Sequence, residues 1–62
     1  MKNLDNLIGL TVKEALKLLD VEYEIRIIAK DGEYMIMTCE YNPLRINVEI
    51  KEDLISEIMG IG

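Results

Sequence analysis

Pro43 divides the central part of this sequence into two stretches of different character. After it, apolar residues alternate with polar ones, and the apolar positions are Leu44, Ile46, Val48 and Ile50. A period of two is typical of a strand that turns one face to a core. Before it, a central strand cannot continue, because proline lacks an amide hydrogen and restricts the residue that precedes it. We therefore expect an exposed extended segment before Pro43 and a strand over residues 44–50.

A helix is predicted to begin after Thr11. Thr11 and Glu14 have the spacing of a capping box, in which hydroxyl and carboxylate each satisfy a free backbone amide of the other residue. An apolar stripe follows at helical spacing: Val12, Ala15, Leu16 and Leu19. We expect the helix to end at Asp20. Residues 1–10 are expected to form a lead-in turn whose leucines pack under the helix.

Two further strands are predicted, over residues 23–30 and 54–61, with turns at residues 31–32 (Asp-Gly) and 51–53. Residues 33–41 are ambiguous, because their apolar side chains would occupy both faces of a strand. They fit either a buried strand, paired through the Asp-Gly turn, or an extended loop that docks on a partner.

These elements predict an α+β fold, with a single helix packed on a small mixed β-sheet. The chain has 62 residues and fits one domain, residues 1–62. A chain of this size buries only about 60% of its unfolded surface, so we expect modest stability. Because the sequence has no Trp and no Phe, its core must be built from Leu, Ile, Val and Met.

The formal net charge of −5 argues against several classes of partner. An acidic surface repels phosphate backbones, so we expect no nucleic acid partner, and the same argument disfavours anionic membrane surfaces. Cys39 is the only cysteine, which excludes an internal disulfide and favours a reducing compartment. With neither an apolar leader nor a membrane-spanning run in the sequence, we expect a cytoplasmic protein.

Nothing in the sequence indicates an enzyme. It contains no His that could serve as the base for Cys39, so nucleophilic catalysis is not expected. The carboxylates lack the spacing of a metal-binding loop, and no glycine-rich phosphate loop is present. We expect neither a metal nor a cofactor.

Residues 38–47, Thr-Cys-Glu-Tyr-Asn-Pro-Leu-Arg-Ile-Asn, resemble the pattern T-M-D-Y-R-P-D-R-L-N of the bacterial peptidase inhibitor 78 family. The two align without gaps, and Glu40 stands in place of the aspartate. The identical positions are Thr38, Tyr41, Pro43, Arg45 and Asn47. Residues 6–15 resemble the opening of the potato inhibitor I serine-protease inhibitors, in which a turn precedes the helix. Asn42 and Leu44 depart from the pattern, which has an arginine and an acid there.

The resemblance implies a potato inhibitor I-like domain that binds a serine protease through a substrate-like reactive loop joining two parallel strands. The loop residues would be Met37, Thr38, Cys39, Glu40 and Tyr41. Cys39 would fill the primary pocket of the protease, and the cleaved bond would be Cys39–Glu40. Arg45 and Asn47 would brace the loop from the strand behind it. A loop that is held rigid in this way binds at a lower entropic cost.

Each of these residues also has a plainer interpretation. Cys39 could be a small buried apolar side chain, Arg45 a solvated strand residue, and the methionines Met35 and Met37 filler in the core. The alternative function is a binding or sequestering module of the same fold, compatible with a phage or bacterial accessory protein. It would bind a host protein or a small signalling ligand. Residues 33–41 would then form a true strand, whose exposed edge supports a homo-oligomer.

Overall fold

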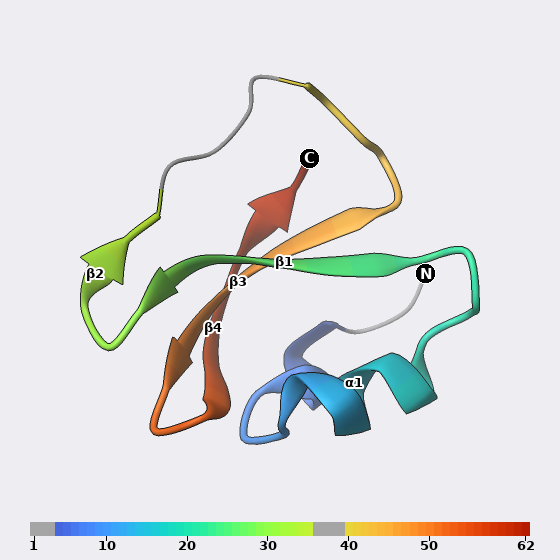
Figure 1. Cartoon of the computed structure of the whole chain (residues 1–62). Helices are drawn as coiled ribbons and strands as arrows, with labels where there is room; N and C mark the ends of the chain where they lie inside the picture. Colours follow the sequence, from blue (N-terminus) through green and yellow to red (C-terminus); the bar gives the residue numbers. More distant parts are fainter. Residues whose placement is uncertain (1–3, 36–39) are drawn as a thin grey trace.

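The computed structural model describes residues 4–35 and 40–62 of the chain. One short α-helix packs on a four-stranded sheet whose strands lie in the order β2-β1-β3-β4 (Figure 1). A 3-10 helix at Leu4–Leu7 precedes α1 at Val12–Leu18. The strands are β1 at Glu24–Lys30, β2 at Glu33–Tyr34, β3 at Arg45–Lys51 and β4 at Leu54–Ile61. The predicted α+β fold, a single helix on a small mixed sheet, is confirmed.

The capping box predicted for the helix is confirmed. The Glu14 amide donates to Thr11 Oγ1 at 3.1 Å, and the Thr11 amide donates to Glu14 Oε1 at 3.0 Å. The helix ends at Leu18, earlier than predicted, because Leu19 already has extended backbone angles (φ −92°, ψ 156°). The predicted apolar stripe is wrong at Leu16, which is exposed. Successive side chains project about 100° apart around a helix axis. In this short helix it is Ala15, the neighbour of Leu16, that is buried.

The sheet is mixed, since β1 and β3 are parallel neighbours while β3 and β4 form an antiparallel hairpin. The predicted bounds of the last strand are confirmed, and β3 begins one residue later than predicted. The register shifts once along the β1–β3 pair and twice along the β3–β4 pair. Such bulges increase the local twist of a sheet. A sheet of this size can thereby curve around the core beneath α1.

The core lies between α1 and one face of the sheet (Figure 1). Alternate residues of β3 supply its centre, as the period of two predicted, and Pro43 lies just before the strand. The buried cluster consists of Leu7, Ala15, Ile46, Val48, Ile50 and Ile55. Leu7 comes from the lead-in turn, so the prediction that leucines of this turn pack with the helix is confirmed. Within the described residues, no helix has the length and apolar character needed to cross a membrane.

The Asp31-Gly32 turn joins β1 to β2, with φ values of 50° and 87°. Both values lie in the left-handed region, where an Asp-Gly hairpin turn places its residues. The alternative of one strand over residues 33–41 is wrong, because β2 contains only Glu33 and Tyr34, and residues 40–44 belong to no strand. The restriction that Pro43 imposes on the backbone accounts for the absence of a strand at residues 40–44.

Candidate functional site

The candidate site is the connection between the parallel strands β1 and β3, in residues 31–44. The resemblance implied such a connection between two parallel strands, and the flanking strands do pair in parallel. Of the expected loop residues, Met37, Thr38 and Cys39 lie outside the described residues. Glu40 and Tyr41 are described, and both are exposed. The described part of the site consists of the residues that follow position 39 and the strands that hold them.

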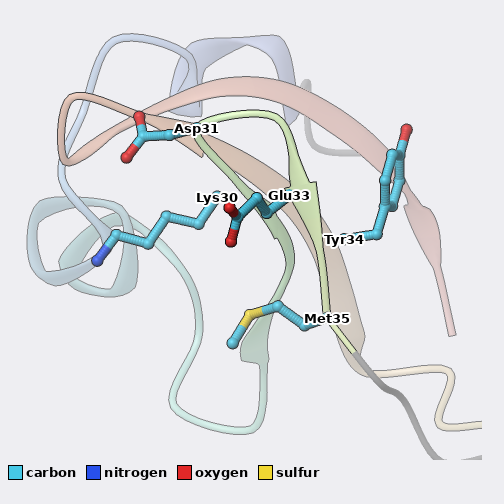
Figure 2. Close-up of a pocket in the computed structure, with 5 residues that line it drawn as sticks. All are labelled: Lys30, Asp31, Glu33, Tyr34 and Met35. Atoms are coloured by element: carbon cyan, nitrogen blue, oxygen red, sulfur yellow. The ribbon is translucent and has the colours of Figure 1, made fainter.

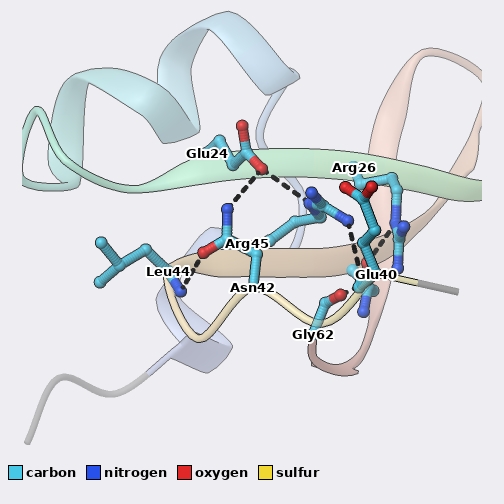
Figure 3. A network of polar contacts seen from close by, with 8 residues as sticks. Glu24, Arg26, Glu40, Asn42, Leu44, Arg45 and Gly62 are labelled. Atoms are coloured by element: carbon cyan, nitrogen blue, oxygen red, sulfur yellow. Dashed lines mark hydrogen bonds and ion pairs between the residues drawn. The ribbon is translucent and has the colours of Figure 1, made fainter. Parts of the chain in front are cut away.

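Arg45, the first residue of β3, links this segment to β1 (Figure 3). Its Nε donates to Glu24 Oε1 at 2.7 Å, and its Nη1 donates to the carbonyl oxygen of Glu40 at 3.4 Å. The guanidinium is mostly enclosed, with its side chain 16% exposed. The structure thus brings Arg45 to the predicted loop. The short ion pair with Glu24 fixes the arginine, and the longer bond reaches the loop backbone.

Asn42 is a second link that the sequence interpretation missed. Its Nδ2 donates to Glu24 Oε1 at 3.0 Å, and its Oδ1 accepts from the Leu44 amide at 2.9 Å. Its carbonyl also accepts from the Arg45 amide at 3.1 Å. These bonds shape the turn around Pro43. The signal was available, because an Asn-Pro pair favours a turn in which the amide side chain bonds to the backbone two residues on.

Glu24 receives both links and is the electrostatic centre of the site (Figure 3). The hydrogen bond from Arg45 is the largest cause that lowers the pKa of Glu24 below its ordinary value. Partial desolvation raises the pKa to a smaller extent, while the charges of Arg45 and Arg26 and the bond from Asn42 lower it further. The carboxylate is therefore held ionised at neutral pH. Glu24 was not predicted, since only the register of β1 against β3 places it opposite Arg45.

Arg26 forms a second guanidinium link on the same side of the sheet. Its Nε donates to Asn47 Oδ1 at 2.9 Å, and its Nη2 donates to the carbonyl of Gly62 at 3.0 Å. The Gly62 amide in turn donates to the carbonyl of Arg45 at 2.9 Å. Asn47, which was predicted to brace the loop, thus accepts a hydrogen bond from Arg26. Arg26 was missed because its position in the sequence resembles that of any polar residue on an amphipathic strand.

Arg45 and Asn42 hold the chain on the two sides of Tyr41. The Tyr41 ring lies against Gly62, where a Cβ atom would be 3.4 Å from Tyr41 Cδ1 and 3.8 Å from Asn47 Nδ2. The ring remains 72% exposed. The described residues therefore form a braced segment, Glu40–Leu44, whose backbone is tied to β1 and β3 and whose aromatic side chain faces solvent.

A shallow hollow lies at the other end of the connection, along β2 (Figure 2). It is lined by Lys30, Asp31, Glu33, Tyr34 and Met35. Met35 is 52% exposed, so the interpretation of this methionine as core filler is wrong. Met37 lies outside the described residues.

Within residues 4–35 and 40–62, no group of three or more His, Cys, Asp or Glu side chains could hold a metal ion. No protein-family model matches the chain, and neither does any curated protein. The candidate site therefore stands on its own geometry, namely an exposed segment braced by Arg45, Asn42 and Glu24 between two parallel strands.

Proposed function

We propose that this protein is a serine protease inhibitor of the potato inhibitor I type, which presents residues 37–41 to the protease as a substrate-like loop. One observation carries the proposal. Arg45 ties the backbone of Glu40 to the ionised Glu24 of the neighbouring strand, immediately after the expected Cys39–Glu40 bond. The resemblance of residues 38–47 to the peptidase inhibitor 78 family also supports it.

The physical basis of the proposal is preorganisation. A flexible peptide loses conformational entropy when it enters a protease cleft, whereas a braced segment has lost much of it in advance. Hydrogen bonds to charged groups are stronger than neutral ones, and Arg45 supplies two such bonds from one side chain. If the bond before Glu40 is cut, Glu40 remains tied to β3 through Arg45. The new amine then stays near the acyl group and favours religation over release.

The experiment is an inhibition assay against a panel of serine proteases with chymotrypsin-, trypsin-, elastase- and subtilisin-like specificity. Mass spectrometry of each incubation locates any cleavage. We expect tight inhibition of at least one protease, with slow cleavage confined to Cys39–Glu40. Arg45→Ala should weaken inhibition and accelerate cleavage, whereas Lys51→Ala, which removes a cation from the other end of the same strand, should change neither.

No inhibition by the folded protein would overturn the proposal. Cleavage at several sites in the connection would also count against it, because a braced segment admits a protease at one bond. The fold and the described contacts would stand in either case.

A second candidate function is the binding or sequestering module. The observation that favours it is the β1–β2 hairpin, which presents Tyr34 and Met35 to solvent. Such a module would bind a host protein or a small ligand, or would form a homo-oligomer. Size-exclusion chromatography with light scattering discriminates the last of these, since a loop inhibitor is expected to be a monomer. A cytoplasmic location belongs to both proposals and rests on the single cysteine.

A further inference from the structure

The connection between β1 and β3 contains two equally exposed tyrosines. Tyr34 lies on β2 and Tyr41 lies in the braced segment Glu40–Leu44, and each residue is 72% exposed. Exposed aromatic side chains supply much of the binding energy of protein interfaces, because they bury a large area and lose little rotamer freedom. The two tyrosines differ in what lies beside their side chains.

The Tyr41 ring lies beside Gly62, which directly follows β4. A Cβ atom on Gly62 would lie 3.4 Å from Cδ1 and 3.6 Å from Cε1 of the ring, which is ordinary van der Waals contact and places the ring beside Gly62. Gly62 is itself held in place, because its carbonyl accepts from Arg26 and its amide donates to the carbonyl of Arg45. One flank of the ring is therefore supported while the rest is open to solvent.

The backbone on both sides of Tyr41 is also held. The Glu40 carbonyl accepts from Arg45, and Asn42 bonds through its side chain to Glu24 and to the Leu44 amide. Because the backbone on both sides of Tyr41 is fixed before binding, the entropic cost of ordering this segment on binding is reduced. The backbone of Tyr34 is held too, because Tyr34 pairs with Ala29 of β1 and the Met35 amide donates to the carbonyl of Ile28. Its side chain, however, points away from those of Lys30, Glu33 and Met35 (Figure 2).

We propose that Tyr41 is the anchor of the interface and determines which proteases are bound. The target would carry an apolar recess beside its catalytic cleft, on the side that receives the residues after the cleaved bond. This inference rests on the proposed function. Proteases with a polar or closed surface at that position would be bound weakly, whatever their preference for the residue before the bond.

The test uses the full chain and the protease of the panel that it inhibits most strongly. The inhibition constant, the rate of cleavage within the complex and the thermal stability are measured for Tyr41→Ala, Tyr41→Phe and the matched control Tyr34→Ala. We expect Tyr41→Ala to weaken inhibition at least 30-fold, the range of an interface hot spot. Tyr41→Phe and Tyr34→Ala should each stay within about threefold of the unsubstituted protein, because the ring carries the contact and the second ring lies outside it.

The cleavage rate separates an anchor from a brace. If Tyr41 only stiffened the segment, Tyr41→Ala would be cleaved faster within the complex, and this result would overturn the inference. Equal inhibition constants for the two alanine variants would also overturn it while leaving the proposed function intact. If the unsubstituted protein inhibits no protease of the panel, the proposed function fails, and this inference fails with it.

Discussion

Replacing Arg26 by methionine tests whether the second guanidinium link holds the site together. The substitution keeps an apolar stem of similar length and removes two hydrogen bonds, of 2.9 Å to Asn47 and 3.0 Å to Gly62. Buried hydrogen bonds to charged groups contribute about 1.5–3 kcal/mol each, but these are partly buried, and water will replace some of the loss. Taking about 1 kcal/mol for each bond, we expect the free energy of unfolding to fall by about 2 kcal/mol. That is a large share of the roughly 3–5 kcal/mol available to a domain this small.

The assay is urea unfolding followed by circular dichroism, with the slope m compared between variants. A change in midpoint at constant m reports stability alone. The expected loss corresponds to a lowering of the melting temperature by about 8–16 °C. Lys51→Met, which removes a cation from the exposed end of β3, is the control and should lie within about 0.5 kcal/mol of the parent. A loss below about 0.5 kcal/mol for Arg26→Met would show that water replaces these bonds fully, and would refute the assignment of a bracing role.

Three further outcomes are expected from urea midpoints. Ile46→Val should cost about 1 kcal/mol because Ile46 is fully buried, whereas Ile61→Val, at the paired position on β4 and 43% exposed, should cost less than half as much. Thr11→Ala should cost about 1 kcal/mol through loss of the helix cap, and an unchanged midpoint would argue against the capping box. Folding lowers the pKa of Glu14, chiefly because its carboxylate accepts a hydrogen bond from the Thr11 amide. It also lowers the pKa of Glu24, chiefly because that carboxylate accepts a hydrogen bond from Arg45. The contribution of these two carboxylates to the free energy of unfolding is therefore complete above the ordinary glutamate pKa of about 4.3. It is lost as the pH falls through their lower pKa values in the folded protein. Glu24→Gln should flatten the fall in midpoint below about pH 4.5, and an undiminished acid dependence in this variant would contradict the cause given for its shift.

Features set by near neighbours in the sequence could be predicted. The capping box of Thr11 and Glu14, the Asp31-Gly32 turn and the strand Leu54–Ile61 each depend on residues a few positions apart, and each is present as expected. Local patterns were less informative where tertiary contacts decide. Leu16 has the spacing of a core residue but lies to the side of a helix that buries only Ala15 fully.

The bracing contacts were the hardest to predict, because they depend on register between strands. Arg45 was expected from the resemblance, but its partner Glu24 is 21 positions away and comes opposite only through parallel pairing. Arg26 meets Gly62 across an even longer separation, with β3 between their strands. The bulge after Ile27 shifts the pairing of β1 with β3, and no pattern in the neighbouring sequence predicts this bulge.

The parallel pairing of β1 with β3 also has a consequence for the order of folding. The β3–β4 hairpin closes through a short turn at Glu52 and Asp53, so its contacts are local and can form within microseconds. Pairing β1 with β3 brings together residues that are 20 or 21 positions apart, such as Lys30 with Ile50 and Glu24 with Arg45. Non-local contacts of this kind slow folding. We therefore expect β1 to dock late in folding. The ion pair between Arg45 and Glu24 would then form only at the end, so the braced segment Glu40–Leu44 would become ordered in the last step of folding.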